Sequence, residues 1–149
     1  MLAGFKTIAL IGKYKSPQIA VPLLQLARFL QGRGVRVVLD PLTSAYVVGN
    51  SLEVLPLDEI GRIADLAIVI GGDGTMLNIA RTLAPYDVAL VGVNQGRLGF
   101  LTDVSIDTML DTIGAMLAGE AVTESRMLLA AQVYRADTRI CDVLAFNDT

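Results

Sequence analysis

The stretch Leu66-Ala67-Ile68-Val69-Ile70-Gly71-Gly72-Asp73-Gly74-Thr75 decides the fold expected for this chain. Its first five residues are apolar, three glycines follow within four positions, and residues 76–80, Met-Leu-Asn-Ile-Ala, can begin a helix. This order predicts a buried strand, a tight turn and a helix. Such a turn brings backbone N–H groups and the N-terminus of a helix close to any phosphate bound beside it.

Strands and helices alternate on both sides of this stretch. Apolar strands are predicted at residues 6–12, 35–39, 66–70 and 88–93. Helices are predicted from Pro17 to Gly32 or Gly34, over 75–84 and over 105–117, with a loop and a short helix within 42–60. The strands are continuously apolar, which is typical of a parallel sheet covered on both faces. The sequence therefore predicts an α/β domain over residues 1–125, with a doubly wound, mainly parallel, Rossmann-like sheet.

The C-terminal part has a different pattern. Residues 128–134 and 139–146 predict two strands joined by a hairpin turn. The sequence ends at Thr149, directly after the second of these apolar strands, with no terminal helix or charged tail. We interpret residues 126–149 as the start of a second, β-rich domain that is truncated in this sequence.

Composition excludes several kinds of chemistry and partner. The chain has 149 residues, of which 53% are apolar, and a net charge of −3 with scattered Lys and Arg. This balance disfavours nucleic-acid binding, and no apolar run reaches the length of a membrane span. Cys141 is the only cysteine and there is no histidine, which excludes an internal disulfide and imidazole chemistry. We therefore expect a cytoplasmic protein without nucleic-acid or membrane partners.

The glycine turn has two interpretations. The chain lacks the spacing of a Walker A loop, and Gly12-Lys13-Tyr14-Lys15 does not fit the Gly-x-Gly-x-x-Gly pattern of many dinucleotide-binding folds. In a structural interpretation, the glycines permit a tight turn and Asp73 caps the following helix. In the other interpretation, the missing side chains expose backbone to a ligand at the carboxyl end of a buried strand.

A second glycine-rich stretch, Val93–Asp103, follows the fourth predicted strand. If the third and fourth strands are neighbours, the turns that follow them face each other across one crevice. Phe100 would offer either an aromatic surface to a base or ordinary core packing. Arg97 would offer either a phosphate contact or a solvated loop charge.

Together these stretches resemble the NAD kinase family. Residues 71–75, Gly-Gly-Asp-Gly-Thr, are similar to an NAD kinase signature that diacylglycerol and sphingosine kinases share and that phosphofructokinases share more loosely. Residues 94–101, Asn-Gln-Gly-Arg-Leu-Gly-Phe-Leu, resemble the second motif of the family, and Asn147-Asp148 resembles the Asn-Asp/Glu pair that follows. The motifs occur in the family's order and at similar spacing, so the resemblance covers essentially the whole chain.

The resemblance implies ATP-dependent phosphorylation of the 2′-hydroxyl of the adenosine ribose of NAD, giving NADP. Asp73 would be the catalytic proton acceptor, although it would act mainly by orienting the hydroxyl, because a carboxylate is a weak base. The nucleotide-binding residues that the resemblance implies are Gly72, Asp73, Gly74, Thr75, Phe100, Asn147 and Asp148. Phe100 would lie beside the adenine, and Asp148 would bind ribose hydroxyls. Mg²⁺ or another divalent cation would bridge the ATP phosphates, and no residue is assigned as a metal ligand, although Asp73 could help to hold the ion.

The resemblance also implies a second, β-rich domain and a homo-oligomer, either a dimer or a tetramer. The Thr/Ser/Gly-rich nucleotide motif of that domain has no match in this sequence. We therefore expect an N-terminal fragment with little or no kinase activity of its own. Two alternatives remain, namely a lipid kinase of the diacylglycerol or sphingosine type and a non-catalytic nucleotide-binding module in which Asp73 is only a cap.

Overall fold

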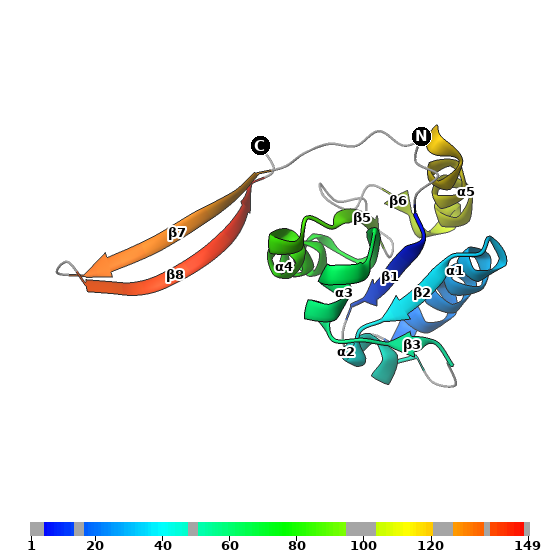
Figure 1. Ribbon diagram of the computed structural model, residues 1–149, viewed down its shortest axis with the longest axis horizontal. Helices are drawn as coiled ribbons and strands as arrows, with labels where there is room; N and C mark the ends of the chain where they lie inside the picture. Colours follow the sequence, from blue (N-terminus) through cyan, green and yellow to red (C-terminus); the bar gives the residue numbers. More distant parts are fainter. Residues whose placement is uncertain are drawn as a thin grey trace.

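The computed structural model describes residues 5–13, 17–47, 51–94, 104–120, 127–135 and 138–147 (Figure 1). The strands are β1 (Thr7–Gly12), β2 (Arg36–Leu39), β3 (Glu53–Val54), β4 (Leu66–Gly71), β5 (Ala89–Asn94), β6 (Val104–Ser105), β7 (Met127–Arg135) and β8 (Thr138–Asn147). The α-helices are α1 (Ala20–Gly32), α2 (Pro41–Ala45), α3 (Leu57–Ile63), α4 (Asp73–Leu83) and α5 (Met109–Ala115). Short 3₁₀ or π turns are η1 (Pro17–Ile19), η2 (Ala84–Tyr86), η3 (Ile106–Thr108) and η4 (Met116–Glu120).

Six strands form one sheet in the order β3-β2-β1-β4-β5-β6, and every pair of neighbours is parallel. From β1 the chain adds strands outward on one side, and from β4 it adds them outward on the other. This is the strand order of a Rossmann-like, doubly wound sheet. The predicted fold class is confirmed, and the order reverses between β1 and β4.

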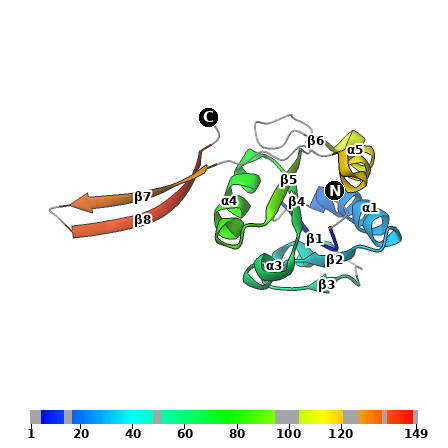
Figure 2. The same cartoon turned by 45° about the horizontal axis from the view of Figure 1, so that its top comes forward.

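The two central strands, β1 and β4, are buried along their whole length. Ile8 and Leu10 of β1 pack with side chains of α1 and α5 in one core cluster. Ala9 and Ile11 pack with side chains of α3 and α4 in another. Figure 2 shows these helix pairs on opposite sides of the sheet. Because successive residues of a strand face opposite sides, burial of both faces requires the continuous apolar runs seen in the sequence.

Three segments differ from the sequence-based predictions. Residues 42–60 contain an edge strand, β3, and the start of α3 in addition to the one short helix predicted there. Strand β6 precedes η3 where a helix was expected to begin at Ser105. Helix α4 begins at Asp73 and not at Thr75. Strands of two residues have no periodicity to detect, and they form because the neighbouring strands β2 and β5 supply hydrogen-bonding partners.

Strands β7 and β8 form a separate antiparallel hairpin, as the sequence predicted. The strands pair from Met127 opposite Asn147 to Arg135 opposite Thr138, with an irregularity at Val133/Tyr134. Figure 1 shows the hairpin apart from the six-stranded sheet. Residues 121–126 lie outside the described part of the chain, and the domain boundary at 125/126 stays a prediction. Among the described helices, none has both the length and the apolar character needed to cross a membrane.

Candidate functional site

The carboxyl ends of β1 and β4 meet where the strand order reverses. Gly12, the last residue of β1, pairs with Ile70 of β4. The N–H of Lys13, directly after β1, donates to the Ile70 carbonyl oxygen at 2.9 Å. The turns that follow the two strands therefore begin side by side. In open α/β sheets this position is where ligands bind.

The turn after β4 changes directly from strand to helix. Gly71 ends β4, Gly72 is the N-cap of α4, and Asp73 is the first helical residue. The prediction that Asp73 itself caps the helix is wrong in position, because Gly72 occupies the N-cap. Asp73 is half-buried in the first turn of α4, where the helix dipole favours a negative charge. The first N–H in the helical hydrogen-bond ladder is that of Met76, which donates to the Gly72 carbonyl oxygen at 3.1 Å.

The three glycines of this turn have different surroundings. A Cβ built at Gly71 would lie 3.0 Å from Thr75 Oγ1 and 3.4 Å from Lys13 Cβ, so packing alone favours glycine there. A Cβ at Gly72 or Gly74 would meet no heavy atom within 4 Å, and both residues are exposed. Gly72 has φ −117° and ψ −172°, which any residue can adopt. Neither packing nor conformation therefore explains the missing side chain at Gly72, which leaves its backbone open to a ligand.

The turn after β5 begins beside the turn after β4. Gly71 pairs with Asn94, the last residue of β5, so the predicted neighbours are neighbours. The Asn94 side chain is 4% exposed, and its Nδ2 donates to the Val104 carbonyl oxygen at 3.1 Å. Asn94 therefore joins β5 to β6 and has a structural role. Arg97 and Phe100 lie outside the described residues.

The third motif lies at the end of the hairpin. Asn147 is the last residue of β8, and Asp148 lies outside the described residues. Strand β8 comes into contact with α4, the helix that begins at Asp73. A shared site for Asp73, Asn147 and Asp148 remains a prediction.

Sequence reasoning missed a buried polar pair below this edge of the sheet. Asp40 is the N-cap of α2, and its carboxylate accepts from the Thr43 N–H at 3.4 Å and from the Thr43 hydroxyl. The same Thr43 hydroxyl accepts from the Gly12 N–H at 3.1 Å. The Asp-Pro-x-Thr spacing of residues 40–43 is a helix-start signal that could have revealed the cap, although not its link to β1.

Metal-binding potential is low among the side chains that the structure describes. They include no group of three or more His, Cys, Asp or Glu side chains that could hold a metal ion. Asp73 is the acidic residue in the first turn of α4.

Comparison with known proteins identifies the family of this fold and turn. Residues 8–121 match the family model of the ATP-NAD kinase N-terminal domain. This chain belongs to that family. It is 60% identical over 144 residues to the NAD kinase of Nitrosomonas eutropha, an alignment that covers 97% of this chain and 49% of the relative. It is 59% identical over 146 residues to the NAD kinase of Nitrosomonas europaea, covering 98% of this chain and 49% of the relative.

Two solved structures share the fold of this chain. The crystal structure of yeast NADH kinase complexed with NADH matches with a TM-score of 0.73 and 17% identity, over 95% of this chain and 46% of that chain. The NAD kinase from Archaeoglobus fulgidus in complex with ATP matches with a TM-score of 0.58 and 21% identity, over 89% of this chain and 45% of that chain. The chain thus spans about half the length of the relatives it matches.

Proposed function

We propose that this chain provides the glycine-turn part of the active site of an NAD kinase. The reaction transfers the γ-phosphoryl group of ATP to the 2′-hydroxyl of the adenosine ribose of NAD and yields NADP. The observation that carries the proposal is the turn at residues 71–75, which has open backbone at Gly72 and Gly74 and a carboxylate at the start of α4. The turn lies where the strand order reverses. The chain also belongs to a family that includes relatives named NAD kinases.

In this proposal Asp73 contacts the ribose 2′-hydroxyl. The carboxylate orients the oxygen for attack, and it accepts the proton as the bond to phosphorus forms. The bond between the γ-phosphorus and the oxygen that bridges it to ADP breaks in the same transfer, and ADP leaves with the electron pair. Positioning and neutralisation of charge account for most of the catalysis in such transfers.

The residues present also fit an ATP-bound divalent cation such as Mg²⁺. Magnesium usually keeps several waters and is held by one or two carboxylates together with substrate phosphates. Asp73 in the first turn of α4 could supply one such carboxylate, as an alternative to its contact with the ribose hydroxyl. The bound cation would neutralise charge on the ATP phosphates.

The remaining assignments complete the proposed site. Thr75 binds nucleotide together with the glycines of the turn, and Phe100 lies beside the adenine. Asn147 and Asp148 hold NAD, with the Asp148 carboxylate on ribose hydroxyls. The proposed full-length protein, meaning this chain with any sequence that continues it, is a cytoplasmic homo-oligomer of two or four chains. Its partners are NAD and ATP, without nucleic acid or membrane. The chain of residues 1–149 alone has little or no kinase activity in this proposal, because a second domain contributes the rest of the site.

Replacement of Asp73 by asparagine tests the proposal. Asn has nearly the same shape as Asp but accepts no proton, so turnover should fall by about 100- to 10,000-fold. The assay follows NADP formed by the full-length protein from NAD, ATP and Mg²⁺. Asp87→Asn is the matched control, because Asp87 is exposed and has φ 59°, a conformation that asparagine tolerates.

Two results would contradict the proposal. Unchanged turnover in Asp73→Asn would remove Asp73 from the chemistry. Phosphorylation of a diacylglycerol or sphingosine by the wild-type protein, with no NADP formed, would assign it to the lipid kinases.

A further inference from the structure

A buried polar network lies between β1, β2 and α2. The side chains of Asp40 and Thr43 belong to residues that are each 1% exposed. The Thr43 hydroxyl donates to Asp40 Oδ1 and accepts from the Gly12 N–H at 3.1 Å. The network thus connects the end of β2 and the first turn of α2 to the last residue of β1.

The network does more than a helix cap requires. An Asp at an N-cap needs only to accept from a backbone N–H of the first helical turn, and it does so equally well when exposed. Asp40 and Thr43 are instead buried, where each polar atom costs free energy unless it is hydrogen-bonded. Among the described residues, every buried side-chain nitrogen or oxygen has such a partner. The bond from Asp40 fixes the Thr43 hydroxyl so that its oxygen is presented to Gly12.

The end of β1 transmits this constraint to the glycine turn. Directly after Gly12, the Lys13 N–H donates to the Ile70 carbonyl oxygen at 2.9 Å. A Cβ built at Gly71 would lie 3.4 Å from Lys13 Cβ, so the two turns lie side by side. A Cβ built at Gly12 would lie 2.1 Å from Ile19 Cδ1, so η1 closely covers Gly12. We therefore expect a shift of Gly12 to reach the turn that leads to Asp73 through the Lys13–Ile70 hydrogen bond.

We propose that Asp40 and Thr43 are positioning residues for phosphoryl transfer, which act through Gly12 and Lys13 on the turn that carries Asp73. The inference rests on the proposed function. Because both residues are 1% exposed, we expect neither side chain to contact the reacting atoms. Loss of the network should therefore lower kcat, which depends on the placement of Asp73, more than it raises KM.

The test compares Thr43→Val with Thr43→Ser in the full-length protein. Valine keeps the shape of threonine but removes the hydroxyl, whereas serine keeps the hydroxyl. Because a misplacement of about 1 Å can cost about 100-fold in rate, we expect Thr43→Val to lower kcat by about 10-fold or more. KM for NAD and for ATP should change by less than about 2-fold, and Thr43→Ser should keep kcat within about 2-fold of wild type.

Two control variants separate positioning from stability. Thr82→Val removes an exposed hydroxyl that donates to the Asn78 carbonyl oxygen at 3.1 Å, near the far end of α4. Ile113→Val trims a buried side chain of α5 and lowers stability without touching the network. Both controls should keep the wild-type kcat when the rate is measured per folded molecule. A wild-type kcat in Thr43→Val, or an equal loss in Thr43→Ser, would overturn the proposal.

Amide hydrogen exchange of Gly12 gives a readout that does not depend on activity. Exchange should be about 10-fold faster or more in Thr43→Val than in wild type, since the Gly12 N–H loses its acceptor. Unchanged exchange would overturn the inference even if the protein makes NADP. Failure of the wild-type protein to make NADP would instead refute the proposed function. Faster exchange of Gly12 in Thr43→Val would then still show that the Thr43 hydroxyl protects the Gly12 N–H.

Asp40→Asn provides a second variant if Thr43→Val does not fold. An amide has one acceptor oxygen where the carboxylate uses two, so one of the two bonds to Thr43 is lost while capping is retained. We expect kcat to fall several-fold with KM unchanged. A wild-type kcat together with wild-type Gly12 exchange in Asp40→Asn would contradict the role of Asp40.

Discussion

Replacing Gly72 by serine is expected to lower activity while leaving the fold intact. Gly72 is the exposed N-cap of α4, with backbone angles open to any residue, and a Cβ there would meet no heavy atom within 4 Å. Serine is preferred to glycine at N-caps, because its hydroxyl can accept from an N–H of the first turn. The free energy of unfolding should therefore stay within about 0.5 kcal/mol of wild type or rise slightly.

The effect on activity should be much larger. In the proposed site, NAD approaches the backbone through the space into which the serine side chain would extend. A displacement of the reacting groups by about 1 Å can cost about 100-fold in rate, which corresponds to about 2.7 kcal/mol of transition-state stabilisation. We expect kcat/KM for NAD to fall by about 10- to 100-fold.

Two measurements on the same full-length variant test this prediction. Steady-state NADP formation gives kcat/KM, and urea unfolding gives the stability. Gly32→Ser is the matched control, because Gly32 is exposed at the end of α1, where a Cβ would also meet no atom within 4 Å. That end of α1 leads into β2 and so lies at the opposite edge of the sheet from Gly72. A wild-type kcat/KM in Gly72→Ser would refute the idea that the nucleotide uses this space.

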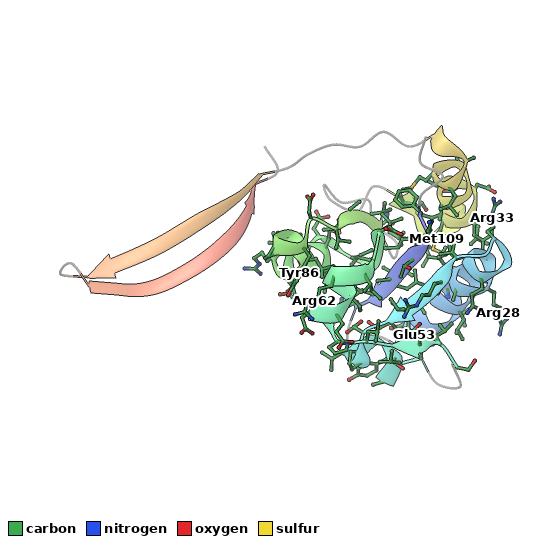
Figure 3. All side chains as sticks on the ribbon, in the orientation of Figure 1. Arg28, Arg33, Glu53, Arg62, Tyr86 and Met109 are labelled. Atoms are coloured by element: carbon green, nitrogen blue, oxygen red, sulfur yellow. The ribbon has the colours of Figure 1, made fainter. Side chains whose placement is uncertain are left out.

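Two further predictions concern stability. A Cβ built at Gly61 would lie 2.4 Å from ring carbons of Tyr86. Tyr86 is labelled in Figure 3. Gly61→Ala should therefore lower the free energy of unfolding by about 1–3 kcal/mol in urea titrations, and wild-type stability would contradict this packing. The Arg36 guanidinium donates to Glu53 at 2.8 Å, and this hydrogen bond lowers the pKa of the Glu53 carboxyl below its usual range. Because the pKa of Glu53 is lower in the folded than in the unfolded state, its ionised carboxylate stabilises the protein at pH values above the unfolded-state pKa. This stabilisation is lost as the pH falls through the folded-state pKa. Glu53→Gln should therefore reduce the loss of stability on acidification, and identical stability–pH profiles in variant and wild type would contradict the pairing.

The central strands were predictable because their environment is uniform. Every residue of β1 and β4 is buried, so the sequence there is apolar without alternation. The edge strands β3 and β6 were not predictable, because two residues show no period and depend on a neighbour for their hydrogen bonds. A local sequence pattern does not give the order of strands in a sheet. The sequence therefore predicted that the turns after β4 and β5 face each other only if these two strands are neighbours.

The glycine turn of the candidate site could be predicted from the sequence, whereas the buried residues that bond to the end of β1 could not. The glycines and Asp73 are contiguous in sequence, so residues 71–75 could be recognised directly. Asp40 and Thr43 were missed because the hydrogen bond between Gly12 and Thr43 joins positions 31 apart in the sequence and forms only when β1 and β2 are paired. Asn94 begins the second motif, and its hydrogen bond to the Val104 carbonyl oxygen was not predictable because it depends on the pairing of β5 with β6.

The position of bound NAD relative to Asp73 tests the proposed function most directly. A crystal structure of the full-length protein with NAD should place the 2′-hydroxyl of the adenosine ribose about 2.6–3.2 Å from a carboxylate oxygen of Asp73. The dinucleotide should also lie against the open backbone of Gly72 and Gly74. A ribose bound elsewhere, with its 2′-hydroxyl beyond hydrogen-bonding distance of Asp73, would contradict the proposed function.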